Sequence, residues 1–238
     1  MIDFHSHILP GMDDGSKSAE ESHEMLLHLK SQGVKKVVAT PHFYANAESV
    51  SDFIKRRKAA YDKIVPFLED GYPQVVLGAE VRYYEGISKL SQIEELCIEG
   101  SNMLLLEMPS SRWTEYILSE LNSISVQGRV ALVLAHIERY MSNQRSAVFN
   151  DLLRNDVLMQ VNASFLTDFF TKRKAIKLFQ QEKIHFIGSD CHNMTSRPPE
   201  ILKAYNAIEN KLGKDFLNDF VDYGNSMLPC NTVSQSQF

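Results

Sequence analysis

The sequence predicts an α/β fold, a parallel β-barrel built from repeated βα units. Short apolar runs alternate with longer amphipathic segments along the 238 residues, and the runs recur at roughly 25 to 40 residues, as in parallel sheets. Metal-binding side chains follow nearly every run, where active sites form in such barrels. Seven units favour a closed or nearly closed seven-stranded parallel (β/α)7 TIM-like barrel. An open doubly wound sheet is the alternative, although the chain lacks a glycine-rich dinucleotide loop.

The predicted strands are short runs rich in Val, Ile, Leu and Met, bounded by charged or turn residues. Runs of this length are typical of buried strands in parallel sheets. They cover residues 2–5, 36–40, 74–78, 103–106, 130–135, 158–161 and 185–187.

Helical segments fill the intervals between these strands. The first opens with a capping-box pattern from Ser18 to Glu21 and stops at Gly33, a residue type common at helix ends. The last carries proline near its first turn, where a missing amide hydrogen is tolerated. The predicted helices cover residues 18–33, 50–69, 113–127, 143–155, 172–181 and 199–212.

Composition and charge indicate one ordinary domain over residues 1–238, with a peripheral tail at 226–238. Hydrophobic residues make up 44% of the chain, enough for a large core, and the net charge of −5 argues against a nucleic-acid surface. The longest obvious apolar run, 130–135, is too short to cross a bilayer, and Met1 leaves no room for a secretory signal. Three scattered cysteines suggest no disulfide framework, so we expect a cytoplasmic protein rather than a membrane protein.

A pair of histidines opens the predicted functional site. His5 and His7 stand one residue apart at the end of the first strand, where alternation points both toward one metal ion. Alone, this pair is a weak signal, and any single strand-end residue is more simply a hydrogen-bonded or solvated side chain. The pattern recurs, however, and its convergence predicts a metal site. The other strand ends supply His42, Glu80, Glu107, His136, Asn162, Asp190 and His192.

The type of ligand limits the metal and its chemistry. Nitrogen and carboxylate ligands without cysteine favour Mn²⁺, Fe²⁺ or Zn²⁺. Because one zinc-type ion uses about four ligands, this many ligands predict two or three ions with a bridging carboxylate. Paired ions stabilise the attacking and leaving oxygens of an in-line displacement at phosphorus, and an ion lowers the pKa of bound water.

The loop after the first strand adds a further candidate. An Asp-Gly pair such as Asp14-Gly15 is most often a turn. This loop, however, leaves the strand end that carries the histidines, so a carboxylate can fold back on the site. We therefore predict Asp14 as a metal ligand and Asp13 as a turn residue.

Two arginines are predicted to bind phosphate. Arg139 lies three residues after His136, and Arg197 lies five residues after His192. Guanidinium groups match phosphate oxygens in a bidentate fashion. A surface or helix-start arginine is the alternative for each of them.

Cys191 and Arg197 reproduce the Cys-x5-Arg spacing of cysteine-dependent tyrosine phosphatases. That chemistry needs a loop of backbone amides around the phosphate and a lowered thiol pKa. The intervening residues contain no glycine, and Pro198 and Pro199 remove two amide donors. Asp190 beside the thiol would raise its pKa further. We therefore interpret Cys191 as a bystander between two ligands.

These motifs together resemble the polymerase-and-histidinol-phosphatase (PHP) superfamily. Three stretches are similar to the bacterial manganese-dependent tyrosine phosphatases of the CpsB, CapC and YwqE type, and the likeness covers nearly the whole chain. They are Ile-Asp-Phe-His-Ser-His-Ile-Leu-Pro-Gly-Met-Asp-Asp-Gly-Ser-Lys, Ala-His-Ile-Glu-Arg-Tyr, and Ser-Asp-Cys-His-Asn followed by Arg-Pro-Pro. Cys191 is a departure from the residue expected there, and it changes neither neighbouring ligand.

The resemblance implies a distorted seven-stranded PHP barrel with three metal ions, most simply Mn²⁺. It implies one ion held by His5, His7, Glu80 and Asp190, a second by Glu80, Glu107 and His136, and a third by Asp14, His42 and His192. Arg139 and Arg197 match the phosphate-binding arginines of that family. The implied reaction is hydrolysis of phosphotyrosine by a metal-bound hydroxide. The implied substrate is the tyrosine-rich tail of a membrane-bound bacterial kinase that controls capsule or exopolysaccharide synthesis.

Three other functions remain open from the sequence. A small-molecule phosphatase, for example one acting on histidinol phosphate, would use the same ligands in a more closed pocket. A nuclease or polymerase-associated proofreading module is disfavoured by the acidic charge. A non-catalytic metal-binding regulator would be expected to lack some ligands.

Overall fold

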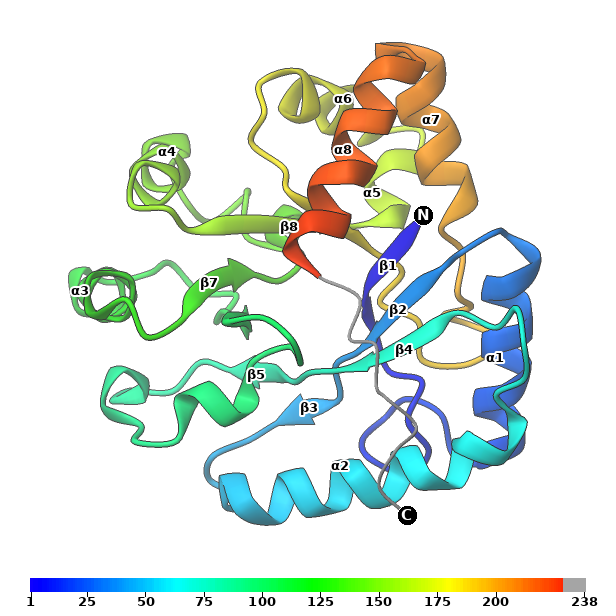
Figure 1. Cartoon of the computed structure of the whole chain (residues 1–238). Coiled ribbons are helices and arrows are strands. Elements are labelled where there is room, and N and C mark those ends of the chain that lie inside the picture. The colour runs from blue at the N-terminus through cyan, green and yellow to red at the C-terminus, as the bar shows by residue number, and fades with distance from the viewer. Residues whose placement is uncertain (229–238) are drawn as a thin grey trace.

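Parallel strands curl around a common centre in the computed structural model, which describes residues 1–228 (Figure 1). Helices α1, α2, α3, α4, α6, α7 and α8 surround the strands in this view. The strands are β1 (Ile2–Ser6), β2 (Lys36–Ala39), β3 (His42–Phe43), β4 (Gln74–Leu77), β5 (Glu80–Arg82), β6 (Met103–Glu107), β7 (Ala131–Leu134), β8 (Leu158–Asn162) and β9 (Phe186–Gly188).

The strands form two hydrogen-bonded groups. β1, β2 and β4 pair in that order, and the second group runs β3, β5, β6, β7, β8, β9. All of these pairings are parallel. The chain after β9 returns to β1, because the Asp190 amide donates to the His5 carbonyl at 2.8 Å and the His7 amide donates to the Cys191 carbonyl at 2.9 Å. This curled parallel sheet confirms the predicted α/β fold class.

The predicted count of seven strands is not confirmed. All seven predicted strands are present, but the chain after β2 and after β4 forms a second short strand in the other group, namely β3 and β5. Pro41 separates β2 from β3 and has no amide hydrogen to continue the ladder. Gly78 and Ala79 make the equivalent step between β4 and β5. Residues 1–228 therefore contain nine strand segments in two groups.

Six of the eight α-helices overlap the predicted ones, whereas α5 and α8 were not predicted. Short 3₁₀ turns occur at Val65–Phe67, Ile87–Lys89, Ile93–Leu96 and Ile137–Arg139. The α-helices are α1 (Ala19–Ser31), α2 (Val50–Ile64), α3 (Glu115–Gln127), α4 (Ser146–Arg154), α5 (Ala163–Thr167), α6 (Lys172–Gln180), α7 (Leu202–Leu212) and α8 (Lys214–Met227).

The helix ends show where local patterns were sufficient. The Ser18 hydroxyl accepts from the Glu21 amide at 3.2 Å, which confirms the predicted start of α1. The predicted helix 50–69 is too long, since α2 ends at Ile64 and a 3₁₀ turn containing Pro66 follows.

A long-range contact sets the start of α7, which was predicted three residues too early. The Gln32 side-chain oxygen accepts from the amides of Ile201 and Leu202, each at 2.9 Å. Gln32 lies at the end of α1, so this cap depends on tertiary structure and has no local sequence signal.

The hydrophobic core has two parts. The smaller part lies among the strands and includes Phe4 and Phe186, whose rings stack with centroids 3.8 Å apart. Val38, Leu105 and Val133 belong to the same cluster. The larger part includes buried residues of the strands and of the surrounding helices. Strands with both faces buried explain the continuous apolar runs in the sequence.

Leu228, directly after α8, is buried in the smaller part of the core, although it falls within the predicted peripheral tail. The rest of that tail, residues 229–238, lies outside the described residues. Among residues 1–228, no helix is both long and apolar enough to span a bilayer.

His185, just before β9, makes the stability of the protein depend on pH. Burial lowers its pKa from 6.5 to about 4, and its Nδ1 accepts from the Met159 amide at 3.0 Å. Because the unfolded state takes up the proton first, this contribution to stability is present above pH 6.5 and is lost as pH falls toward 4. We expect this histidine to cost about 2 kcal/mol of unfolding free energy between pH 7 and pH 5.

Urea unfolding of the wild type and of His185→Gln at both pH values measures this contribution. The variant should lose less stability on acidification, by about that amount. A variant as acid-sensitive as the wild type would show that His185 does not carry the effect.

Candidate metal centre

The nine predicted ligands gather at the carboxyl ends of the strands. They come from β1 and its following loop, from the first residues of β3 and β5, from the end of β6, and from the residues after β7 and β9. The structure brings all of them together, namely His5, His7, Asp14, His42, Glu80, Glu107, His136, Asp190 and His192.

Glu80 lies at the middle of this cluster. Its Oε2 is 3.2 Å from His5 Nε2, 3.3 Å from His7 Nε2 and 3.0 Å from His42 Nδ1. Its Oε1 is 2.8 Å from His136 Nε2. Burial acts to raise the pKa of this carboxyl, but the surrounding histidines outweigh burial and hold it well below its usual range. Glu80 is therefore ionised and contacts four imidazoles at once.

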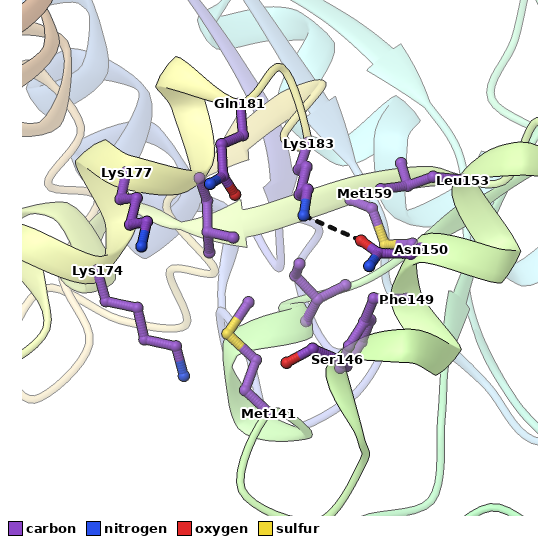
Figure 2. A pocket seen from close by; sticks show the side chains of 12 residues that line it. Met141, Ser146, Phe149, Asn150, Leu153, Met159, Lys174, Lys177, Gln181 and Lys183 are labelled. Carbon is purple, nitrogen blue, oxygen red and sulfur yellow. Dashed lines mark hydrogen bonds between the residues drawn. The ribbon is translucent and has the colours of Figure 1, made fainter.

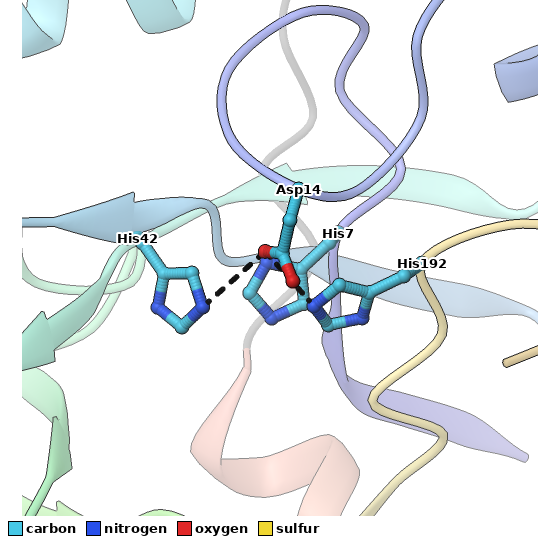
Figure 3. A group of neighbouring side chains, drawn as sticks. All are labelled: His7, Asp14, His42 and His192. Carbon is cyan, nitrogen blue, oxygen red and sulfur yellow. Dashed lines mark ion pairs between the residues drawn. The ribbon is translucent and has the colours of Figure 1, made fainter.

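Three groups of donor atoms within this cluster are compact enough to hold an ion, each with its atoms within 4.8 Å of one another. Figure 3 shows one of them, in which His42 and His192 flank the Asp14 carboxylate beside His7. Asp14 Oδ1 lies 3.3 Å from His192 Nε2 and 3.7 Å from His42 Nε2. The groups are His7, Asp14, His42 and His192; His5, His7 and Asp190; and His42, Glu80 and Glu107. Compared with the sets implied by the resemblance, the first group contains His7 in addition, the second lacks Glu80, and the third contains His42 in place of His136.

The tautomers of His5 and His7 show that this centre fits a cation. The Gln160 side-chain oxygen accepts from the His136 amide at 2.7 Å and lies 3.3 Å from His5 Nδ1, so Nδ1 of His5 is the protonated nitrogen. His7 Nδ1 lies 2.7 Å from an Asp13 carboxylate oxygen and is protonated for the same reason. Both Nε2 atoms are then unprotonated in the neutral rings, yet they lie only 3.1 Å apart.

Two lone pairs facing each other beside ionised carboxylates are repulsive unless a positive charge lies among them. In the metal-free protein, protons on these rings supply that charge. Burial acts to lower the pKa of His5, but Glu80 and Asp190 outweigh burial and raise it. A divalent ion would satisfy the same atoms without protons. His42 Nδ1 is also buried, and its 3.0 Å contact with Glu80 Oε2 lacks the geometry of a hydrogen bond. The donor set therefore fits metal ions.

Residues that orient the imidazoles were missed or misjudged from the sequence. Asp13, predicted to be a turn residue, does bond the Gly15 amide at 2.9 Å, but its other oxygen orients His7. Gln160 orients His5, and the Tyr140 hydroxyl lies 3.1 Å from His136 Nδ1. A histidine ligand usually donates its second nitrogen to such a partner. The position of Gln160, two residues before the strand-end Asn162, was the available signal, since alternate residues share a face.

Backbone geometry at the centre is specialised. His136 and Asp190 both have positive φ angles, 32° and 54°, which non-glycine residues adopt rarely and at a cost of about 1–3 kcal/mol. Gly15 and Gly188 provide space: a Cβ on Gly15 would lie 2.3 Å from the His7 carbonyl, and one on Gly188 would lie 2.4 Å from His5 Cβ. Only glycine allows these chains to approach the two histidines so closely.

The two predicted phosphate-binding arginines lie at the edge of the cluster. Arg197 donates to Asp190 Oδ1 at 2.9 Å, and Arg139 donates to the other oxygen of the same carboxylate. Asn162, at the end of β8, also donates to Asp190, at 2.8 Å, and so acts as a hydrogen-bond donor in the structure. The Arg139 side chain is 44% exposed and the Arg197 side chain 39% exposed. Both line a pocket of about 350 Å³ together with Ser164. A phosphate group entering this pocket would meet two cations beside the metal-ligand cluster.

Cys191 is unsuited to be a nucleophile. Its side chain is fully buried, and burial, with smaller effects of Asp3 and Asp190, raises the pKa of the thiol well above 9. A thiol must ionise and reach the phosphate to attack it. The structure therefore supports the interpretation of Cys191 as a bystander.

A curled parallel sheet with a cluster of candidate metal ligands at its strand ends places the protein among the TIM-like α/β proteins. Residues 1–228 match the CpsB/CapC family, described as capsular polysaccharide synthesis. The chain belongs to this family, which confirms the resemblance seen in the sequence.

Relatives and a solved structure agree with this assignment. The tyrosine-protein phosphatase CpsB of Streptococcus pneumoniae is 30% identical over 90% of this chain and 91% of its own. The tyrosine-protein phosphatase YwqE of Bacillus subtilis is 28% identical over 90% of this chain and 86% of its own. A crystal structure from work on YwqE and CpsB, described as unique metal-dependent tyrosine phosphatases, has a TM-score of 0.78 at 24% identity and covers 96% of this chain and 94% of that one. The structural match shows the same fold.

Proposed function

We propose that this protein is a metal-dependent protein-tyrosine phosphatase that acts in capsular or exopolysaccharide synthesis. The observation that carries the proposal is the buried centre, where imidazole nitrogens and carboxylates converge beside two guanidinium groups. Membership of the CpsB/CapC family and the names of the relatives support the same activity.

The cluster would hold two or three divalent ions, most simply Mn²⁺, although the same donors suit Fe²⁺ or Zn²⁺. Bound ions would offset the charge of the phosphate and lower the pKa of water enough to supply hydroxide near neutral pH. The proposed ligands are His5, His7, Asp14, His42, Glu80, Glu107, His136, Asp190 and His192.

The side chains of the protein position the reacting groups. Arg139 and Arg197 would bind the non-bridging oxygens of the phosphate and orient the phosphorus for in-line attack by water. Asp13 holds one nitrogen of His7 protonated so that the other faces the centre. The bond between phosphorus and the tyrosine oxygen then breaks, and the oxygen leaves as phenolate. Since phenol has a pKa of about 10, it is a better leaving group than an alkyl alcohol, and no strong general acid is required.

The proposed substrate is phosphotyrosine on the tail of a membrane-bound tyrosine kinase. The half-exposed arginines favour this class, because a phosphate carried on a flexible tail can reach them from solvent. A small phosphate monoester, by contrast, is usually bound in a pocket that buries most of its surface.

Turnover of p-nitrophenyl phosphate after chelation, with and without added Mn²⁺, tests the proposed chemistry. We expect chelated protein to be inactive, Mn²⁺ to restore turnover, and Cys191→Ser to retain activity within about twofold because the buried thiol takes no part. His136→Ala should abolish turnover, since its Nε2 contacts Glu80. Phosphotyrosine peptides then test the substrate class.

The alternative outcomes are separable in the same experiment. Activity that is insensitive to chelator and lost in Cys191→Ser would replace the metal mechanism with a thiol mechanism. Restored turnover of p-nitrophenyl phosphate without any turnover of phosphotyrosine peptides would indicate a small-molecule phosphatase. Metal binding without turnover of either substrate would indicate a regulator.

A further inference from the structure

Two phenylalanines protrude from the loop between α5 and α6. Phe169 and Phe170 are 88% and 87% exposed, the highest values for large hydrophobic residues among residues 1–228. Their rings contact each other with centroids 5.5 Å apart. Exposed apolar groups that lie together on a protein surface commonly mark an interaction site.

The loop holds these rings outward in a defined conformation. The Asp168 carboxylate accepts from the amides of Phe170 and Thr171 at 2.8 and 3.2 Å. The Thr171 hydroxyl donates to the Phe165 carbonyl at 2.8 Å, which ties the loop back to α5. The exposure of the two rings is therefore built into the loop.

A cluster of cations follows the phenylalanines on α6. Lys172, Arg173 and Lys174 occupy its first turn, and Lys177 follows one turn later. In the described part of the chain none of the four forms an ion pair, whereas the protein as a whole carries a net charge of −5. Positive charges at a helix N-terminus oppose the helix dipole, so their location is unfavourable for α6 by itself. Their placement instead suits an anionic partner.

The same helix borders an apolar pocket. Figure 2 shows Lys174 and Lys177 on one side of this pocket, opposite Phe149, Leu153 and Met159 of α4 and β8. The pocket has a volume of about 270 Å³. Apolar walls with amino groups at their margin match a molecule that is apolar at one end and anionic at the other.

We propose that the surface formed by Phe169, Phe170 and the cations of α6 docks on an anionic lipid bilayer. The phenyl rings would enter the interface between headgroups and acyl chains, and the lysines and Arg173 would contact lipid phosphates. A lipid bilayer is favoured over an acidic peptide because the two rings protrude from the surface, whereas peptides are generally held in grooves or on sheet edges.

Docking there would bring the candidate metal centre close to the bilayer. Ser164 and Thr167 of α5 line the pocket that contains Arg139 and Arg197, and Phe169 follows Thr167 by two residues. Substrates attached to the membrane would then meet the centre at a raised local concentration. The docking itself does not depend on phosphatase activity.

Vesicle co-sedimentation of the full chain tests the proposal. The probes are vesicles of phosphatidylcholine alone and of phosphatidylcholine mixed equally with phosphatidylglycerol. We expect binding only to the anionic vesicles, and weaker binding as salt is raised. Phe169→Ser/Phe170→Ser should weaken partitioning more than tenfold, and Arg173→Gln/Lys174→Gln should weaken it about fivefold for each charge removed.

Matched variants at other exposed positions provide the controls. Val126→Ser removes another apolar side chain, 80% exposed on α3, and Lys211→Gln/Lys214→Gln removes two exposed charges near the start of α8. Both should partition like the wild type. Turnover of p-nitrophenyl phosphate in Phe169→Ser/Phe170→Ser should stay at the wild-type level, which separates a docking defect from a catalytic one.

Three results would overturn the proposal. These are equal binding to both vesicle types, anionic binding unchanged by the Phe169 and Phe170 substitutions, and absence of vesicle binding. If phosphotyrosine peptide binding were lost in these variants while vesicles did not bind, the surface would be assigned to peptide recognition instead.

Discussion

Glu80→Gln is expected to lower kcat by about a thousandfold or more, because one carboxylate serves most of the centre. Its two oxygens lie within 3.3 Å of nitrogens of four histidines. An amide at this position is neutral, so it would remove the charge that joins the metal-ligand groups. Losing several kcal/mol of metal-assisted stabilisation corresponds to about three powers of ten in rate.

Two measurements separate this effect from a general loss of structure. Metal content, measured by elemental analysis after dialysis, should fall in Glu80→Gln, while the circular dichroism spectrum should remain that of the wild type. Glu120→Gln is the matched control, because Glu120 is also buried and bonded, to Tyr83, Gly86 and Ser88, but lies outside the centre. It should keep its metal content and most of its kcat. Equal losses in the two variants, or a tenth of the activity surviving in Glu80→Gln, would contradict a central role for this carboxylate.

The sequence revealed the candidate ligands because their positions follow a local rule. In a parallel barrel the residue after each strand faces the active-site end, so the apolar run alone locates it. His42, Glu80 and His136 needed no knowledge of neighbouring strands to be selected. The structure brings them together as that rule predicts.

A local rule places Gln160 on the same strand face as Asn162, but the partners of the supporting residues could not be predicted in that way. Gln160 reaches both His5 and the His136 amide only because of how β8 lies against its neighbours. Asp13 and Asp14 are adjacent and chemically identical, yet the loop turns Asp13 inward to His7 and leaves Asp14 64% exposed at its side chain. Such differences arise from tertiary packing, which a single sequence does not record.

The fold shows the same division between local and long-range information. Strand positions follow from apolar runs, whereas the exchange of partners between β2 and β3 depends on how the sheet closes. α8 lacks a distinct start signal, since Gly213 separates it from α7 without a side-chain cap. Met227 at the end of α8 packs against the core cluster that contains Ile2 and Phe4, and this contact becomes visible only in three dimensions.

Replacing Arg197 or Arg139 by lysine is expected to lower kcat/KM for a phosphotyrosine peptide by about 10- to 100-fold. Lysine keeps the charge but loses the planar fork that bonds two phosphate oxygens at once. A charge-assisted hydrogen bond contributes about 1.5–3 kcal/mol, which corresponds to this range of rate constants. Inorganic phosphate should inhibit both variants more weakly than it inhibits the wild type.

The contacts of these arginines with Asp190 predict a difference between lysine and alanine variants. Both guanidinium groups bond the Asp190 carboxylate. Burial acts to raise the pKa of this carboxyl, but His5 and His7 outweigh burial and keep the pKa low. Lysine substitution preserves the positive charge beside Asp190, so the effect should fall mainly on KM and on phosphate inhibition. Alanine substitution removes that charge as well, and should also lower kcat and metal content if Asp190 is a ligand.

Arg129→Lys is the matched control, because Arg129 is also paired with a carboxylate but lies outside the candidate metal centre. Arg129 forms an ion pair with Glu94 on the surface at 2.5 Å. It precedes β7, whereas the candidate ligand His136 follows that strand, so the two residues lie at opposite ends of it. This substitution should leave kcat/KM unchanged, since an exposed ion pair contributes little to stability and this one makes no contact with the candidate metal ligands. If both Arg139→Lys and Arg197→Lys kept kcat/KM within twofold of the wild type, the two arginines would be partners of Asp190 alone. Phosphate binding would then have to rest on the metal ions.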